Sequence, residues 1–275
     1  MNTEIYNTED INTGKVLEKL RQKRPIIHHI TNYVTVNDCA NMTLAIGAAP
    51  VMAHAKEEVE EMVAISNALV LNIGTLDQTQ IESMLIAGKK ANELDIPIIL
   101  DPCGAGATKL RTESANKLIM DLKISVIKGN AGEIGTLAEA EAEMRGVESG
   151  GVKGSPETVA KTLAKKTGST IVMTGKEDII VDANKIYKVH NGSPMAGKIT
   201  GGGCMAASLI ASFSAIEKDY VKASVAALIC FGIAQELAEK QSDGSGSFHT
   251  QLFDKIYSLS TIIIPQYQKY IRRDI

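Results

Sequence analysis

Hydrophobic residues in this chain are concentrated in short, mostly apolar runs that are separated by longer amphipathic stretches. The clearest runs cover residues 26–30, 68–73, 96–100 and 170–174. Apolar runs of this length, bounded by turn residues, are typical of strands buried on both faces. Because the runs alternate with stretches of helical period, the pattern predicts an α/β fold with a mostly parallel sheet between two layers of helices.

The amphipathic stretches predict the helices between these strands. We expect helices at 13–23, 36–46, 56–67, 77–94, 112–122, 130–138, 156–166 and 204–217. Two further short strands are expected at 49–52 and 124–127, and residues 178–189 read as two strands that form an antiparallel edge.

The remaining segments are expected to be loops or helices. Residues 1–12 are polar and residues 146–155 are rich in glycine, so both predict loops. The chain after residue 204 is expected to be mainly helical to its end. Because no linker rich in Pro, Gly or Ser divides the sequence, we expect one domain spanning residues 1–275.

Composition narrows the range of possible functions. The 275 residues are 44% hydrophobic and 22% charged, with a formal net charge of −3 and no Trp. The charge and the few aromatic residues argue against a nucleic-acid partner. The polar start of the chain does not resemble a secretory signal, and we expect no apolar run that approaches the roughly 20 residues of a membrane-spanning helix. Four widely spaced cysteines suggest reduced thiols, and we expect a cytoplasmic protein.

Three consecutive glycines, Gly201, Gly202 and Gly203, precede the apolar helix predicted from residue 204. A glycine turn at a helix start presents unpaired backbone N–H groups and a positive dipole end, which together suit a phosphate. Cys204 stands beside this turn. A flexible turn before a core helix explains the same residues, and their spacing matches neither the Walker nor the dinucleotide motif.

Polar residues follow several of the predicted strands, where parallel α/β sheets bind their ligands. They are Asn32, Gly74, Asp101, Lys128, Asn130, Glu133 and Thr174. Each has a structural explanation as a turn or cap residue, and Glu133 could complete a capping box with Asn130. Carboxylates, a lysine and a phosphate-sized turn at one edge of a sheet nevertheless suit a magnesium–nucleotide complex.

Several segments together resemble the hydroxyethylthiazole kinases of the ribokinase-like superfamily. They include residues 101–106 (Asp-Pro-Cys-Gly-Ala-Gly) and 200–204 (Thr-Gly-Gly-Gly-Cys), with further matches at 29–34, 49–52, 71–76 and 129–134. The resemblance covers nearly the whole chain. It implies a ribokinase-like three-layer fold and ATP- and Mg²⁺-dependent phosphorylation of the alcohol of 5-(2-hydroxyethyl)-4-methylthiazole, for thiamine phosphate synthesis. It also implies a homotrimer with active sites at subunit interfaces.

The resemblance also implies roles for individual residues. The thiazole would contact Asn32, Val34, Met52, Gly74 and Gly201. ATP would contact Asp101, Lys128, Glu133 and Thr174, while Asp101, Asn130 and Glu133 would organise Mg²⁺. Gly201, Gly202 and Gly203 would form the anion hole for the transferring phosphoryl group, and Cys204 would be an assisting base rather than a covalent nucleophile.

This sequence departs from the family's pattern at two positions. Lys128 stands where many relatives have Arg, which keeps the charge but loses a bidentate fork. Cys103 replaces a usual Val, for which we expect only a packing role.

Other functions remain open from the sequence. The alternatives are a ribokinase-like kinase for hydroxymethylpyrimidine or pyridoxal, an NAD(P)H-hydrate dehydratase of the same fold, and a nucleotide-binding regulator without catalysis. Cys204 argues against the first two, which carry Asp at this position. The retained Asp101, Asn130 and Glu133 argue against the third.

Overall fold

A nine-stranded sheet forms the centre of the protein, seen here in a computed structural model that describes residues 10–144 and 154–274. The strand order is β2-β1-β3-β4-β5-β6-β7-β8-β9. The first six are parallel and the last three are antiparallel. Their bounds are β1 Ile26–Ile30, β2 Ala49–Val51, β3 Ala68–Asn72, β4 Ile98–Asp101, β5 Val126–Asn130, β6 Thr170–Thr174, β7 Asp178–Val181, β8 Lys185–Val189 and β9 Tyr270–Asp274.

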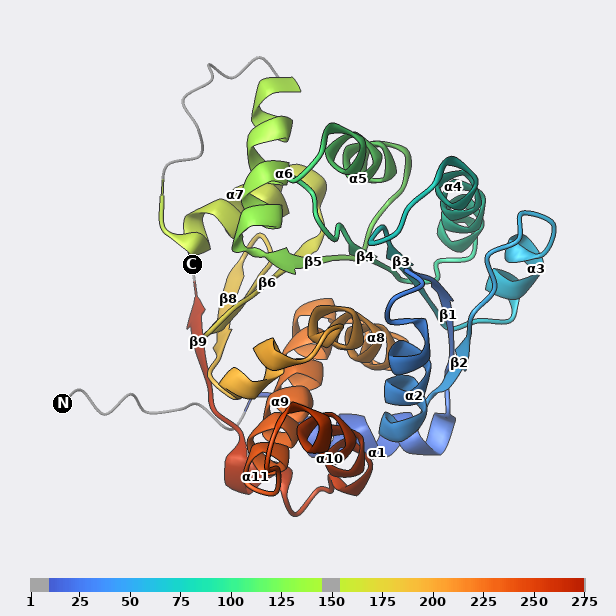
Figure 1. The fold of residues 1–275 in the computed structure, drawn as a ribbon. Coiled ribbons are helices and arrows are strands. Elements are labelled where there is room, and N and C mark those ends of the chain that lie inside the picture. Colours follow the sequence, from blue (N-terminus) through green and yellow to red (C-terminus); the bar gives the residue numbers. More distant parts are fainter. Residues whose placement is uncertain (1–9, 145–153, 275) are drawn as a thin grey trace.

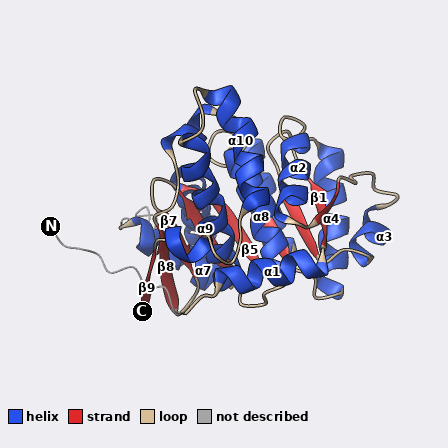
Figure 2. Ribbon diagram, turned by 90° about the horizontal axis from the view of Figure 1, so that it is seen from below, coloured by secondary structure: helices blue, strands red, loops and turns tan. Residues whose placement is uncertain are grey.

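Helices cover both faces of this sheet, as Figure 1 shows. One layer contains α3 Val59–Ala64, α4 Gln78–Glu93, α5 Lys109–Asp121, α6 Ala131–Met144 and α7 Pro156–Thr167. The other contains α1 Thr13–Lys23, α2 Val36–Ile46, α8 Gly202–Ser214, α9 Tyr220–Glu239, α10 Ser245–Ser258 and the short α11 Ile264–Tyr267, and it lies in front of the strands in Figure 2. The ribokinase-like three-layer arrangement expected from the sequence is confirmed.

A hydrophobic core lies between the sheet and each of the two helix layers, and the strands contribute side chains to both cores. Along β3, Ala68 and Val70 face the core under α8 and α9, whereas Leu69 and Leu71 face the core under the other layer. This alternation with period two explains why both faces of a parallel strand must be apolar. The continuous apolar runs in the sequence therefore identified the buried strands.

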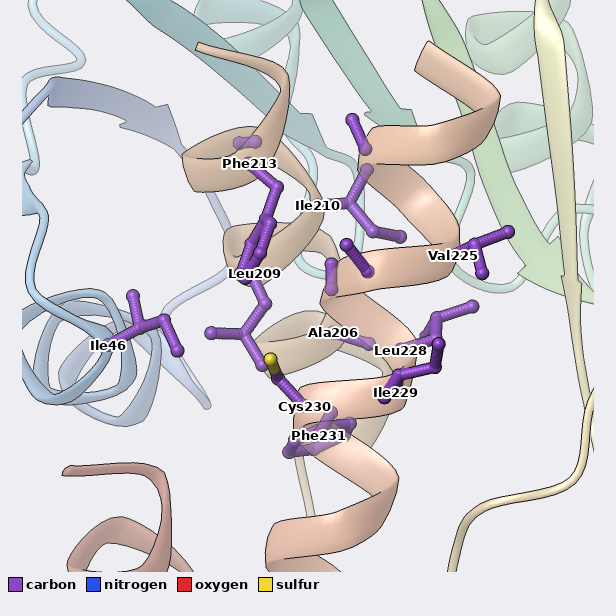
Figure 3. Packing of buried hydrophobic residues seen from close by; sticks show 14 of the residues in the cluster. Ile46, Ala206, Leu209, Ile210, Phe213, Val225, Leu228, Ile229, Cys230 and Phe231 are labelled. Carbon is purple, nitrogen blue, oxygen red and sulfur yellow. The ribbon is translucent and has the colours of Figure 1, made fainter. Parts of the chain in front are cut away.

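Helices α8 and α9 form the densest part of the first core. Figure 3 shows Cys230 of α9 pointing toward Leu209 of α8, with Ile210 and Phe213 further along α8 in the same cluster. All residues of α8 from Cys204 to Ser214 are buried. Such a helix has little freedom to shift, so its N-terminus is held firmly at the carboxyl edge of the sheet.

The composition of α9 corrects one expectation. Tyr220–Glu239 is long and apolar enough to cross a membrane by length and composition, although no such run was expected. In the fold, 83% of its most apolar stretch is buried. Its hydrophobicity is that of a central core helix that contacts α1, α8 and α10 as well as the sheet.

Most other differences concern the ends of elements. The predicted helix 56–67 is confined to α3, because residues 56–58 form a turn. Helices α5 and α6 and strand β4 are displaced by a few residues from their predicted bounds. The predicted glycine-rich loop falls mostly on residues 145–153, outside the described residues, as do residues 1–9 of the predicted N-terminal loop.

Strand β9 is the element that the sequence analysis missed, because the chain after residue 204 was expected to be mainly helical. It pairs antiparallel with β8, and Tyr270 is fully buried. The Asp10 carboxylate accepts hydrogen bonds from the hydroxyls of Tyr187 (2.6 Å) and Tyr270 (2.9 Å). These contacts join distant parts of the chain and have no local signal.

Gly232 tests the packing of α9. A Cβ at this position would lie 2.6 Å from the backbone carbon and oxygen of Asn191, which cannot yield as a flexible side chain does. We expect Gly232→Ala to destabilise the fold by about 1–3 kcal/mol and to lower the Tm by several degrees. The matched control is Gly135→Ala in α6, where a Cβ meets no atom within 4 Å. This control should be neutral or stabilising in the same thermal unfolding assay, and equal Tm values for the two variants would contradict the packing argument.

Candidate active site

The carboxyl ends of β1, β3, β4, β5 and β6 and the N-terminus of α8 surround a hollow of about 460 Å³. Most of the residues singled out by the sequence line it: Asn32, Val34, Gly74, Asp101, Lys128, Asn130, Glu133, Thr174, Gly201, Gly203 and Cys204. The parallel strands bring these residues together from six separate segments of the chain, as expected for this type of sheet.

A second hollow of about 750 Å³ adjoins the first, and Thr174 and Gly203 line both. Gly202 also belongs to the second hollow. Its walls combine apolar side chains with polar ones, including Leu228, Phe231, Asn191 and Gln235. Met52, which follows edge strand β2, lines neither hollow.

The glycine turn has the geometry that an anion site requires. Gly201 is the N-cap of α8 and has φ +84°, a left-handed conformation that favours glycine. The first hydrogen bond of the helix runs from Met205 N–H to Gly201 C=O (2.8 Å). The N–H groups of Gly202, Gly203 and Cys204 therefore have no partner within the helix.

Lys128 lies directly beside this helix end. A Cβ at Gly203 would stand 2.7 Å from Lys128 Nζ, so the absence of a side chain there leaves room for the ammonium group. The ammonium also contacts Asp101 Oδ2 at 3.4 Å, and both side chains are almost completely buried. A fixed positive charge and open N–H groups thus occupy the same part of the hollow.

The charges around Lys128 keep it protonated. Burial alone lowers the pKa of its ammonium, but the charges of Asp101, Cys204 and Glu133 outweigh this effect and raise it. Burial raises the pKa of Asp101, and the nearby Lys128 opposes that rise. A divalent cation beside Asp101 would favour its ionised form further.

Glu133 and Asn130 form the capping box considered from the sequence. Glu133 Oε2 accepts from Asn130 N–H (2.8 Å), and Asn130 Oδ1 accepts from Glu133 N–H (3.0 Å). Glu133 Oε1 also accepts from Gly104 N–H (2.8 Å), which fixes the loop after β4. Each carboxylate oxygen retains a further lone pair, so the structural role leaves capacity for a ligand.

Arg111 is a residue of the site's surroundings that sequence reasoning missed. Its guanidinium donates to the carbonyls of Gly74 (2.7 Å) and Cys103 (2.7 Å), and at 3.3 Å to that of Ile73. It thereby ties the loop after β3 to the loop after β4. An arginine near a helix start carries no local sequence signal for this contact.

Asn72 was also missed as a site residue, although it ends β3. It is 1% exposed, and its side-chain amide contacts the Cys204 sulfur at 3.3 Å. Asn32 reaches the same sulfur at 3.3 Å. A polar residue at the end of an apolar strand, two residues before Gly74, was the available signal.

Comparisons with known proteins agree with this geometry. The sequence model described as "Hydroxyethylthiazole kinase family" matches residues 17–261. A hydroxyethylthiazole kinase of Methanocella arvoryzae is 58% identical over 245 residues, covering 89% of this chain and 92% of the relative.

Solved structures extend the comparison to the fold. The structure of a hydroxyethylthiazole kinase protein from Pyrococcus horikoshii OT3 has a TM-score of 0.88 at 39% identity, covering 95% of this chain and 98% of that one. A Staphylococcus aureus pyridoxal kinase solved in complex with ADP has a TM-score of 0.60 at 13% identity, covering 91% and 98%. This second likeness concerns the fold alone.

Asp178 at the start of β7 gives the site a titration that can be measured. It lines the second hollow, and its Oδ1 accepts from Gly175 N–H (3.0 Å). Burial raises the pKa of Asp178 to about 6, against about 3.9 in an unfolded chain. The folded protein thus holds this proton more tightly, which contributes stability below about pH 4 that is lost as the pH rises through about 6.

Asp178→Asn removes this titration but keeps an oxygen for Gly175. We expect the Tm of the variant to gain on that of the wild type as the pH rises from 4 to 7, and the difference to level off above that. Thermal unfolding of both proteins between pH 4 and pH 8 measures this. Parallel pH profiles would show that Asp178 does not carry the effect.

Proposed function

The chain belongs to the hydroxyethylthiazole kinase family, and from this premise we propose that it uses ATP and Mg²⁺ to phosphorylate the primary alcohol of 5-(2-hydroxyethyl)-4-methylthiazole. This reaction would salvage the thiazole for thiamine phosphate synthesis. The observation that carries the proposal is the hollow where an open helix N-terminus, a buried ammonium and the Cys204 sulfur meet. The four free thiols suit a reducing compartment, so we propose that the enzyme acts in the cytoplasm.

ATP would occupy the second hollow and direct its phosphates toward the first. The apolar walls at Leu228 and Phe231 suit a nucleobase, and the two hollows meet at Thr174 and Gly203. The Lys128 ammonium would then bind the phosphates close to the γ-phosphate. Asp101 and Glu133, which line the same hollow, would also lie near the phosphates. Thr174, at the boundary, would contact the same nucleotide.

The donor set fits a magnesium ion that keeps water and phosphate ligands. Among the described residues, no group of three or more His, Cys, Asp or Glu side chains could hold a metal ion by itself. Asp101, Glu133 and the amide of Asn130 nevertheless line one hollow and offer the oxygen ligands that Mg²⁺ prefers. When bound there, the ion would neutralise charge on the phosphates.

The residues of the chain account for the remaining chemistry. The substrate hydroxyl oxygen attacks the γ-phosphorus, and the bond from that phosphorus to the bridging oxygen breaks, so that ADP leaves with the electron pair. The hydroxyl proton moves to Cys204 Sγ. The N–H groups of Gly202, Gly203 and Cys204, with Lys128, would stabilise the charge on the transferring group without needing to reorganise.

The thiazole would lie at the outer end of the first hollow, against Val34, Gly74 and Gly201. Val34 and its neighbour Tyr33 are large apolar residues with exposed fractions of 65% and 57%. A substrate site that ends in exposed apolar side chains supports an interface between subunits at this point, in the homotrimer that we propose. In that assembly Met52 and Asn32 would complete the substrate's surroundings, and light scattering would measure the oligomeric state.

An assay with several alcohols tests the substrate. With ATP and Mg²⁺, we expect phosphorylation of the hydroxyethylthiazole and at least about a hundredfold lower kcat/KM for hydroxymethylpyrimidine and pyridoxal. Product formation followed by mass spectrometry and ADP release followed by a coupled assay give independent readouts. No phosphorylation of the thiazole at millimolar concentration would overturn the proposal, and a pyridoxal or pyrimidine product would identify the alternative kinase. ATP binding without transfer to any alcohol would favour the regulator.

Substitutions of Cys204 test its role as the proton acceptor. We expect Cys204→Ala to lower kcat by more than about tenfold, because general-base catalysis contributes at least that much. Cys204→Asp should retain or exceed wild-type activity, since a carboxylate accepts protons. Cys230→Ala, a change in the core between α8 and α9, is the matched control and should leave kcat unchanged. An inactive Cys204→Asp would contradict the role.

A further inference from the structure

Asn72 is a buried amide whose hydrogen bonds have one possible arrangement. Its Oδ1 accepts from Gly74 N–H (2.9 Å) and from Asn32 Nδ2 (3.0 Å). A backbone N–H can only donate, so it identifies the oxygen of the Asn72 amide without ambiguity. The nitrogen must then be the atom that faces Cys204 Sγ at 3.3 Å, and it is also the donor of the hydrogen bond that Asn72 makes to the Asp101 carboxylate.

The same reasoning identifies the oxygen and the nitrogen of the Asn32 side-chain amide. Its Oδ1 accepts from Thr35 N–H (3.0 Å) and from the Thr35 hydroxyl (3.0 Å). Its Nδ2 therefore points to Asn72 Oδ1 and to Cys204 Sγ, the latter at 3.3 Å. All four side-chain polar atoms of the two asparagines have partners inside the protein.

The sulfur consequently faces two N–H donors and no acceptor from this pair. A thiol could donate its proton only to another group, whereas a thiolate accepts from both amides. Cys204 also stands in the first turn of α8, where the helix dipole favours a negative charge. Two independent features thus favour sulfur as an acceptor.

We propose that Asn72, together with Asn32, holds the Cys204 sulfur in position as a hydrogen-bond acceptor and so prepares it to receive the substrate's proton. This inference rests on the proposed function. Asn72 is a positioning residue, because it acts on the hydroxyl through Cys204. In the step itself, the O–H bond of the alcohol breaks and an S–H bond forms, while the alcohol oxygen keeps the electron pair for the new O–P bond.

Other titratable groups also surround the sulfur, and they come from several elements. The ammonium of Lys128 on β5 is one of these groups, and its interaction with Cys204 is among the causes that raise the pKa of Lys128. The thiols of Cys39 on α2 and Cys103 after β4 are near it, and burial raises their pKa values to about 12 and about 11, so both stay neutral. His29 on β1, which contacts Ser208 one turn further along α8, is kept neutral because burial lowers its pKa to about 4. The carboxylates of Asp101 and Glu133 line the same hollow as Cys204 and interact with Lys128.

Asn72→Asp separates the donor from the structural role of this residue. The aspartate keeps the size and an oxygen for Gly74 N–H, but it replaces the N–H donor with a second oxygen, adds a charge beside Cys204 Sγ and removes the donor to Asp101. Asn72→Leu is therefore needed beside it, because the leucine removes the donor without adding a charge. Asn72→Leu removes both functions, and Asn72→Ser is a smaller change if the leucine variant does not fold. The matched control is Asn92→Asp, because Asn92 also bridges a carbonyl and an N–H group, both of Lys123, away from the site.

The first measurement is the alkylation of Cys204 by iodoacetamide, followed by mass spectrometry of the peptide that contains it. The limiting alkylation rate at high pH measures how accessible the sulfur is. The pH at which the rate is half of that limit measures where the thiol ionises to the thiolate. We expect this pH to rise by about one unit or more in Asn72→Asp and Asn72→Leu, and to be unchanged in Asn92→Asp. Wild-type profiles in both Asn72 variants would overturn the inference.

The second measurement is a double-mutant cycle on kcat. We expect Asn72→Asp to lower kcat by about tenfold or more in the wild-type background, while the KM for the alcohol changes less than about threefold. In the Cys204→Ala background the same substitution should change kcat less than about twofold. An equal loss in both backgrounds would show that Asn72 acts independently of Cys204. Because alkylation needs no substrate, it tests the inference even if the proposed reaction is not observed.

Discussion

The site depends on where helix α8 begins. Its N–H groups cannot be satisfied within the helix, and its core packing against α9 prevents the end from moving toward another partner. The sheet supplies what the helix lacks, since the carboxyl ends of five strands bring polar side chains to that point. An anion is the natural ligand for such an arrangement, and the buried Lys128 reinforces it.

Several residues of the site serve both the fold and the chemistry. Glu133 caps α6 and holds the Gly104 loop with the same carboxylate that faces the hollow. Asn72 fixes the Gly74 loop with its oxygen and contacts Cys204 with its nitrogen. Such sharing explains how the site achieves precise geometry with few charged groups, because each side chain is held by backbone atoms before any ligand arrives.

The sequence predicted the sheet and most of the residues that line the first hollow, because both have local signals. Apolar runs identify the buried strands, and Asp101, Lys128 and Thr174 are the polar residues at or near the carboxyl ends of those strands. The contacts of Arg111 join loops that lie next to each other only after folding, so nothing at that residue indicated them. Asn72 offered one signal, its place at the end of an apolar strand, but its contact with Cys204 also forms only after folding. Strand β9 was missed for a similar reason, since Tyr270 is buried by β8 and by Asp10 from the other end of the chain.

The close approach of Lys128 to Gly203 has a consequence for how this sequence can diverge. The ammonium occupies the space that a side chain at position 203 would need, so a side chain there would displace the cation. An alanine at position 203 would require a shorter or displaced cation at position 128. A guanidinium at position 128 would have to fit beside the backbone of Gly203. A larger cation at position 128 would therefore also have to be accommodated beside the backbone at Gly203, and an exchange of Lys for Arg changes the shape of the group as well as its hydrogen-bonding geometry.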